Sequence, residues 1–225
     1  MKPSPQYEPF LTRRFDLALQ FASGLHHAQT RKGTHIPYIA HLMSVSALVL
    51  ESGSDEDQAI AALLHDAVED QGGLPTLETI RRMFGERVAK IVRECSDSES
   101  PNPDNKPPWH QRRQAYLQHL HTASPEAVLV AVADKLHNVR AILTDYRQVG
   151  DRVWQRFNKE ATKEDQLEFY SQLIETLRQI AAPTVMVDEM DKLLKELDGP
   201  CSARVMFSAS MNHFNGRRFQ ERSDE

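Results

Sequence analysis

One segment constrains the fold of this chain more than any other: AVLVAVADKLHNVRAILTDYR, residues 127 to 147. Its apolar residues recur at helical spacing, and the first half is apolar on all sides of the helix that this spacing predicts. Such a helix must be covered by other elements, so we expect it at the centre of a bundle. A single acid, Asp134, interrupts the apolar run, and a buried carboxylate is costly unless a partner compensates it.

Other segments predict amphipathic helices that can pack around this centre. Glycine is scarce, with 9 in 225 residues, and runs of β-branched or aromatic residues are few, which favours helix over strand. Helical spacing is found over residues 11–29, 38–52, 55–70, 76–84, 86–95, 109–122, 125–147, 162–181 and 183–198. Residues 96–108 carry four prolines and predict a loop. The sequence therefore predicts an all-α, multi-helix bundle.

The length of the chain is that of one domain with a short appendage. We expect the domain over residues 1–182, a C-terminal helix over 183–198 that is set off by Pro183, and a mobile tail over 199–225, where the apolar periodicity fades.

Charge and composition exclude several classes of protein. The formal net charge of −5 argues against a protein that binds nucleic acid through its bulk charge. No apolar run approaches the roughly 20 residues of a membrane span, and the N-terminus lacks the pattern of a signal peptide. The two cysteines, Cys95 and Cys201, suggest neither a zinc cluster nor a secreted disulfide scaffold. We expect a cytoplasmic protein with no membrane partner.

The densest group of polar residues is His65, Asp66, Glu69 and Asp70, directly after the apolar run AIAALL. This group has two interpretations: a helix end that emerges into solvent before Gly72 and Gly73, or a site at which a cation compensates the acids. Two further residues favour the second, because His41 begins the neighbouring helix and Asp134 lies within the central one. Together these segments supply nitrogen and oxygen ligands of the kind that suits manganese, iron, zinc or cobalt.

Three motifs occur in the order RKGTHIPYIAH (31–41), ALLHDAVED (62–70) and ADKLHNVRA (133–141). They resemble the HD superfamily of metal-dependent phosphohydrolases and, more closely, the hydrolase domain of the RelA/SpoT family and its stand-alone small alarmone hydrolases. The resemblance covers about residues 11–150. It implies an HD-domain bundle that removes the 3′-pyrophosphate of guanosine tetra- or pentaphosphate, the stringent-response nucleotides, in a manganese-dependent reaction that yields GDP or GTP and pyrophosphate.

The resemblance also implies roles for particular residues. The metal ligands would be His41, His65, Asp66 and Asp134, and the attacking water would be oriented and activated by Glu69 and Asp70. Arg31 and Lys32 would line the pocket for the nucleotide base, and Asn138 would contact the ribose or a phosphate. Because the chain is acidic overall, cations must be concentrated where an anionic nucleotide binds. The basic residues in or beside the motifs are Arg31, Lys32, Lys106, Arg112, Arg113, Lys135 and Arg140.

Some alternatives remain open at this point. The sequence does not decide whether Glu69 or Asp70 is the main base. The motifs depart from the family at Leu42, where a proline is common, and at Ala141, where a threonine is common. The loop over residues 96–108 also differs from the better-known members. The departures at Ala141 and in this loop leave open a different substrate, the adenosine counterpart of the alarmone or another phosphorylated nucleotide. A nucleotide-binding regulator without turnover is the alternative from a different class, and the intact acidic pair favours the enzyme.

Overall fold

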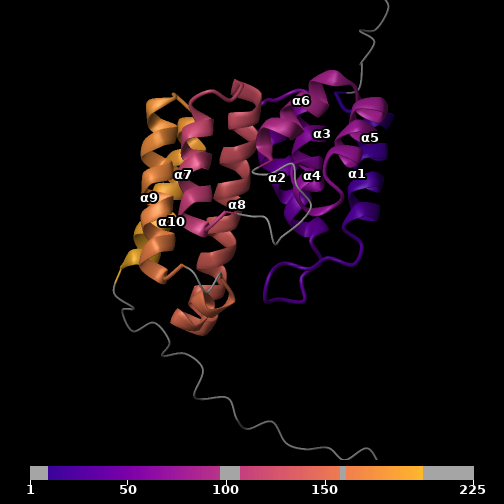
Figure 1. Cartoon of the computed structure of the whole chain (residues 1–225). Helices are drawn as coiled ribbons and strands as arrows, with labels where there is room; N and C mark the ends of the chain where they lie inside the picture. The colour runs from indigo at the N-terminus through magenta and orange to yellow at the C-terminus, as the bar shows by residue number, and fades with distance from the viewer. Residues whose placement is uncertain (1–9, 97–106, 158–160, 200–225) are drawn as a thin grey trace, which may run out of the picture.

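The computed structural model describes residues 10–96, 107–157 and 161–199, and its regular elements are helical (Figure 1). Within these ranges no strand forms, and one isolated bridge joins Thr30 to Pro37. The prediction of an all-α bundle is confirmed. The elements in chain order are α1 (Arg13–Leu25), α2 (Ile39–Glu51), α3 (Glu56–Leu64), α4 (Ala67–Asp70), α5 (Leu74–Phe84), α6 (Glu86–Cys95), α7 (Trp109–Leu120), α8 (Pro125–Val149), η2 (Gly150–Arg156), α9 (Lys163–Gln179) and α10 (Thr184–Asp198).

Helix α8 lies between two groups of helices, as its apolar character predicts. In Figure 1 the helices α1 to α6 lie on one side of it and α7, α9 and α10 on the other. It packs against α2, α3 and α6 from the first group and against α10 from the second. Val130, Val132, Ala133, Leu136 and Val139 of α8 have no exposed surface. Because α8 touches both groups, a side chain at its middle can meet residues from α2 and α3.

The helix expected over residues 55–70 is divided, and the division falls at two of the predicted metal ligands. Helix α3 begins with a capping box between Asp55 and Gln58 and ends at Leu64, and α4 begins at Ala67. The turn residues between them, His65 and Asp66, keep backbone angles in the right-handed helical region. The prediction of one continuous helix was wrong because a turn of this kind scarcely disturbs the spacing of the apolar residues.

The segment between α1 and α2 folds back on itself and directs residues toward α8. Backbone hydrogen bonds join Arg31 to Ile36 and Gln29 to Tyr38, at 2.8 and 2.9 Å. Gly33 adopts a φ of +72°, and a Cβ there would lie 2.8 Å from the Cβ of Arg156. A side chain at position 33 would therefore be strained and would push this segment away from η2.

Helix α10 packs against both α8 and α9. Three pairs of opposite charge accompany this packing: Arg140 with Glu189, Arg147 with Glu196 and Arg178 with Asp191. Apart from Gly199, the tail expected over 199–225 lies outside the described residues. Within the described ranges, no helix has the length and apolar character that crossing a membrane would require.

Candidate functional site

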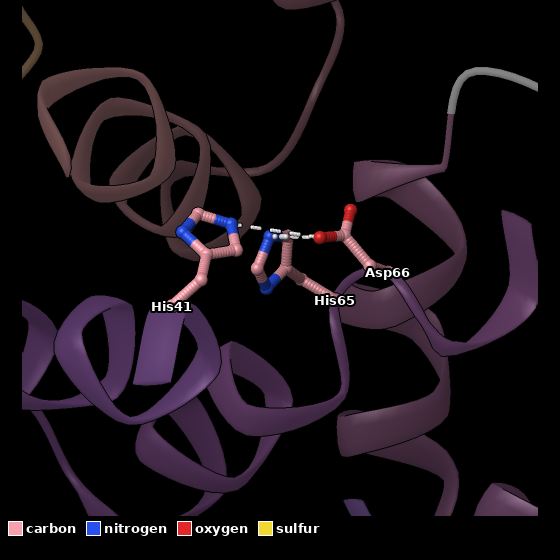
Figure 2. Close-up of side chains that lie close together, drawn as sticks. All are labelled: His41, His65 and Asp66. Carbon is pink, nitrogen blue, oxygen red and sulfur yellow. Dashed lines mark ion pairs between the residues drawn. The ribbon is translucent and has the colours of Figure 1, made fainter. Parts of the chain in front are cut away.

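The four predicted metal ligands lie where α2, the turn between α3 and α4, and the middle of α8 come together. Their ligand atoms are close: Nε2 of His41 lies 3.2 Å from Oδ1 of Asp134 and 3.6 Å from Oδ2 of Asp66. Nε2 of His65 lies 3.0 Å from Oδ2 of Asp66 and 3.7 Å from Oδ1 of Asp134. Figure 2 shows both imidazoles turned toward the carboxylate of Asp66. The cluster formed by these four residues is hereafter the His-Asp cluster.

The cluster is buried, and its charges depend on one another. His41 is 1% exposed, His65 4% and Asp134 7%. Burial alone would lower the pKa of His65, but the nearby Asp66 and Asp134 charges hold it well above its usual value. Burial would likewise raise the pKa of Asp66, but the His65 charge keeps it well below its usual value. Asp66 is only partly buried, with 22% of its side chain exposed, but polar groups packed this closely and this far from solvent still need mutual compensation or a cation.

The inner nitrogen of His65 is evidence that the cluster suits a cation. This Nε2 atom is buried and has no hydrogen-bond partner among the described residues, although the Asp66 carboxylate is near. The Nδ1 atoms, which point away from the cluster, each have a partner. Nδ1 of His65 contacts the Ala62 carbonyl oxygen, and Nδ1 of His41 contacts Nδ1 of His137, both at 2.8 Å. Metal-binding histidines are commonly fixed in this way through the nitrogen that does not bind the metal. The cluster can therefore hold a divalent metal ion.

The two carboxylates of the cluster have partners of their own. The Tyr38 hydroxyl donates to Oδ2 of Asp66, and the Asn138 amide donates to Oδ1 of Asp134, both at 2.6 Å. The ammonium group of Lys135 lies 2.6 Å from Oδ2 of Asp134 and 4.8 Å from the centre of the Tyr116 ring. Sequence reasoning missed Tyr38, although its place three residues before His41 within the first motif was a signal.

A cavity of about 800 Å³ opens beside the cluster, a size that fits a small molecule. All the residues predicted to bind substrate line it: Arg31, Lys32, Lys135, Asn138 and Arg140. Arg112 and Arg113 line it as well, whereas Lys106 lies outside the described residues. Positive charge is thus concentrated on one cavity of an acidic chain, as an anionic ligand requires.

Two of these arginines are already engaged. The guanidinium group of Arg31 donates to the Asn138 amide oxygen at 2.6 Å and lies 5.8 Å from the centre of the Tyr38 ring. Arg140 forms two hydrogen bonds with the Glu189 carboxylate, at 2.7 and 2.8 Å. The side chain of Arg140 is therefore tied to α10, a connection across 49 residues that the sequence pattern does not reveal.

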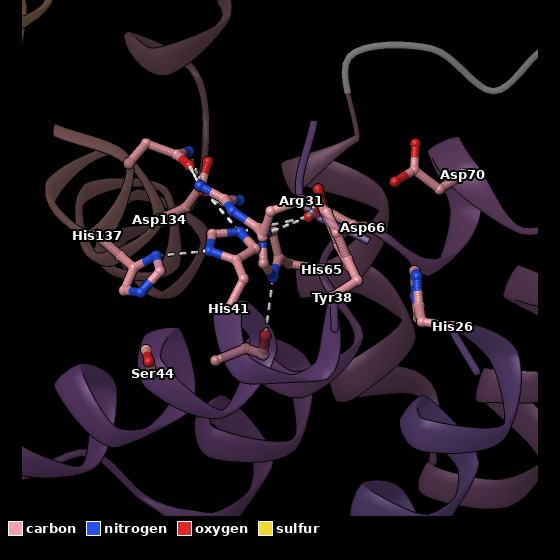
Figure 3. A network of polar contacts seen from close by, with 12 residues as sticks. His26, Arg31, Tyr38, His41, Ser44, His65, Asp66, Asp70, Asp134 and His137 are labelled. Carbon is pink, nitrogen blue, oxygen red and sulfur yellow. Dashed lines mark hydrogen bonds and ion pairs between the residues drawn. The ribbon is translucent and has the colours of Figure 1, made fainter. Parts of the chain in front are cut away.

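The two acids predicted to activate water, Glu69 and Asp70, also line the cavity. Glu69 is half-buried and borders a second, smaller cavity of about 30 Å³ together with His65, Asp66 and Asp134. Asp70 is exposed, and its Oδ2 accepts a hydrogen bond from the Gln29 amide at 2.8 Å. Figure 3 shows Asp70 beside His26 and on the opposite side of the His-Asp cluster from His137.

The fold is an all-α bundle, and its site brings two histidines and two aspartates together beside a cavity lined by arginines and lysines. This combination is typical of helical proteins with a His-Asp metal site. The chain belongs to the HD domain family, whose sequence profile matches residues 18–166. The resemblance that the three motifs indicate is therefore confirmed.

Individual relatives agree with this assignment. The chain is 38% identical over 126 residues, 55% of its length, to a Xenopus tropicalis protein named guanosine-3′,5′-bis(diphosphate) 3′-pyrophosphohydrolase MESH1, and the match covers 66% of that protein. The protein of the same name from Drosophila melanogaster is 33% identical over 130 residues, 56% of this chain and 68% of its own length. A longer Aquifex aeolicus guanosine-3′,5′-bis(diphosphate) 3′-pyrophosphohydrolase is 36% identical over 128 residues, 56% of this chain and 17% of its length.

A solved structure shares the fold. It is described as a metazoan ortholog of SpoT that hydrolyzes ppGpp, and it superposes with a TM-score of 0.66 at 26% identity. The superposition covers 84% of this chain and 98% of that one.

Proposed function

We propose that this chain hydrolyses the 3′-pyrophosphate of guanosine 3′,5′-bis(diphosphate) and of the corresponding pentaphosphate, and releases GDP or GTP and pyrophosphate. The observation that carries the proposal is the His-Asp cluster at the wall of a cavity lined by arginines and lysines. A cation site next to concentrated positive charge suits a phosphorylated small molecule. The names of the frog, fly and Aquifex relatives support this particular nucleotide.

The metal ion in this proposal is manganese, held by His41, His65, Asp66 and Asp134. Two imidazoles and two carboxylates form a donor set of nitrogen and oxygen atoms, which manganese accepts along with other divalent transition metals. When bound, such an ion lowers the pKa of water and neutralises charge on phosphate oxygens. His137 and the Ala62 carbonyl oxygen keep the two imidazoles turned inward, so the ligand atoms are arranged before an ion binds.

Glu69 and Asp70 act on the water. Both line the cavity, and Glu69 also borders the smaller cavity beside His65, Asp66 and Asp134. In the reaction, a water oxygen forms a bond to the phosphorus that is attached to the ribose 3′ oxygen, and the bond between that phosphorus and the 3′ oxygen breaks. One of the two carboxylates accepts a proton from the water, and the 3′ oxygen leaves as a hydroxyl group after protonation.

The remaining residues bind the nucleotide. Arg31 and Lys32 contact the base, with Arg31 held in place by Asn138 and Tyr38. Asn138 thereby joins the substrate side of the cavity to Asp134, since its amide nitrogen donates to that carboxylate. Lys135 supports Asp134 from the other oxygen and adds positive charge near the phosphates. Arg140 binds phosphate when its contact with Glu189 opens.

The proposal is tested with purified protein, manganese and a panel of guanosine and adenosine nucleotides, with products resolved by anion-exchange chromatography. We expect equal amounts of GDP and pyrophosphate from guanosine 3′,5′-bis(diphosphate), and neither product after removal of the metal by a chelator. Release of pyrophosphate from the adenosine nucleotides alone would assign the enzyme a different substrate. Tight binding of the guanosine nucleotide without any product would overturn the assignment as an enzyme.

A further inference from the structure

A chain of hydrogen bonds connects the buried end of α1 to Asp70. The Gln29 amide nitrogen donates to Oδ2 of Asp70 at 2.8 Å. The Gln29 amide oxygen contacts Nδ1 of His26 and the Gln71 amide nitrogen, both at 2.7 Å. The contact between Gln29 and Asp70 spans 41 residues and crosses from the α1–α2 segment to α4.

The chemistry of the partners fixes how this chain is oriented. An ionised carboxylate only accepts hydrogen bonds, so the amide nitrogen of Gln29 must face Asp70. The amide oxygen must then face His26, and the proton in that contact is carried by Nδ1 of the imidazole. His26 therefore acts as a donor that holds Gln29, and Gln29 acts as a donor that holds Asp70.

His26 occupies a buried position, where a histidine is unusual if its only role is packing. It is 2% exposed, and its ring is stacked on the Tyr38 ring at 5.2 Å between centroids. Burial lowers the pKa of His26, which keeps the ring neutral. Residues 10–96, 107–157 and 161–199 supply no hydrogen-bond partner for its Nε2 atom. An unpaired buried nitrogen is unfavourable for stability, so an apolar side chain would serve packing better.

We propose that Gln29 and His26 are positioning residues that hold the Asp70 carboxylate in the orientation needed to accept a proton from the attacking water. Asp70 is exposed, so rotation of its carboxylate is limited by the groups that bond to it rather than by close packing. The hydrogen bond from Gln29 restricts this rotation, and His26 and Gln71 restrict Gln29 in turn. This inference rests on the proposed function and selects Asp70 over Glu69 as the base.

Replacement of Gln29 by methionine tests the inference, because it keeps the length of the side chain and removes both hydrogen bonds. Misplacement of a reacting group costs up to about 100-fold in rate, so we expect kcat for pyrophosphate release to fall roughly 10- to 100-fold. KM should stay within about twofold, because Asp70 is not used to bind the nucleotide. In the D70N background, Q29M should lower the residual kcat by less than about twofold, because the group that it positions is no longer a base.

A second pair of variants separates positioning from packing. In H26N, the amide nitrogen can replace Nδ1 as the donor to Gln29, whereas H26L fills the same buried space without a donor. We expect H26N to retain most of the kcat and H26L to lose it as Q29M does. The matched control is H27L, since His27 is exposed and its Nδ1 atom contacts the Gly24 carbonyl oxygen within α1, away from Gln29 and Asp70. Unfolding temperatures are measured for every variant.

Several results would overturn the inference. The wild-type chain could release pyrophosphate while Q29M keeps its full kcat, in which case only the positioning role fails. Q29M could lower kcat by the same factor in the wild-type and D70N backgrounds, which would indicate a general structural effect. A wild-type chain that releases no pyrophosphate from any nucleotide would overturn the proposed function, and the positioning role along with it.

Discussion

The His-Asp cluster and the ion pairs along α10 both bring acids and bases together, but at different depths in the protein. In the cluster, His41, His65 and Asp134 are nearly inaccessible to solvent, and the Nε2 atom of His65 has no hydrogen-bond partner among the residues described. Along α10, Arg140 and Glu189 meet at 2.7 Å with side chains that are 41% and 39% exposed. Charges in the first region are paired away from solvent, whereas charges in the second are paired at the surface, where water screens them.

The difference indicates what each region contributes. Exposed pairs contribute about 1 kcal/mol or less, so the α10 contacts adjust stability without deciding the fold. The cluster keeps polar groups in the core at a cost that packing alone does not repay, and a bound cation would offset it. Substitutions should therefore have large, metal-linked effects in the cluster and small, independent effects along α10.

The largest effect is expected from H65A and D66A. Each removes a ligand atom from the cluster, and because the loss of even an outer partner of a metal ligand costs about 10- to 100-fold, we expect at least about a 100-fold loss of pyrophosphate release. Bound manganese, measured by elemental analysis after dialysis, should fall below one ion per chain. H121A, at an exposed histidine after α7, is the matched control. Full metal content in either variant would contradict the assignment of the ligands.

A smaller effect is expected at His137, which holds the outer nitrogen of His41. H137L removes that support, and the affinity for manganese should fall roughly 10- to 100-fold. H137N keeps an oxygen that can accept the hydrogen bond from His41, so its affinity should stay close to that of the wild-type chain. Competition with a chelator of known affinity measures both values. Equal affinities for H137L and H137N would exclude a role for this hydrogen bond.

Release of Arg140 from Glu189 should improve substrate binding modestly. In E189Q the arginine keeps its charge but loses its charged partner. An exposed ion pair of this kind contributes about 1 kcal/mol or less, so KM for the nucleotide should fall by at most about fivefold. E196Q is the control, because its partner Arg147 is not among the residues that line the cavity. Steady-state kinetics that show the same KM for both variants would mean that Arg140 does not contact the nucleotide.

The smallest expected effect is on the stability of the fold, through the ion pair between Arg178 of α9 and Asp191 of α10. Hydrogen bonds from Lys195 and then Arg178 lower the pKa of Asp191 below its ordinary value of 3.8. The lowered pKa means that this carboxylate stabilises the fold above pH 3.8 and loses that contribution as the pH falls through the lower, folded-state value. D191N should reduce the unfolding temperature by at most about 2–4 °C at pH 7. Thermal scans should show the difference vanishing well below pH 3.8, and a difference that persists there would contradict this account.

Much of the fold follows from local sequence patterns. Helical spacing, the scarcity of glycine and the proline-rich loop predict the order of the helices, and the apolar run of α8 predicts its central place. Asp134 is recognisable as a site residue because an acid in such a run needs a compensating partner. The division between α3 and α4 is not recognisable, because His65 and Asp66 keep nearly helical backbone angles.

Other parts of the site depend on contacts between distant segments. The hydrogen bond from Gln29 to Asp70 spans 41 residues, the bond from Arg31 to Asn138 spans 107, and the contact of Arg140 with Glu189 spans 49. A pattern within one helix carries no information about the side chain that faces it from another. The sequence therefore predicts which residue types gather, while the pairing among them emerges only from the packing of the α1–α2 segment, α4, α8 and α10.

The central claim is that the His-Asp cluster holds the metal ion. Anomalous diffraction from a crystal grown with manganese tests it most directly, with data collected where manganese scatters anomalously. We predict one strong peak bounded by Nε2 of His41, Nε2 of His65 and the carboxylates of Asp66 and Asp134, and no such peak in a D134N crystal. A peak at any other place, with these four side chains unchanged and without an ion between them, would contradict the account.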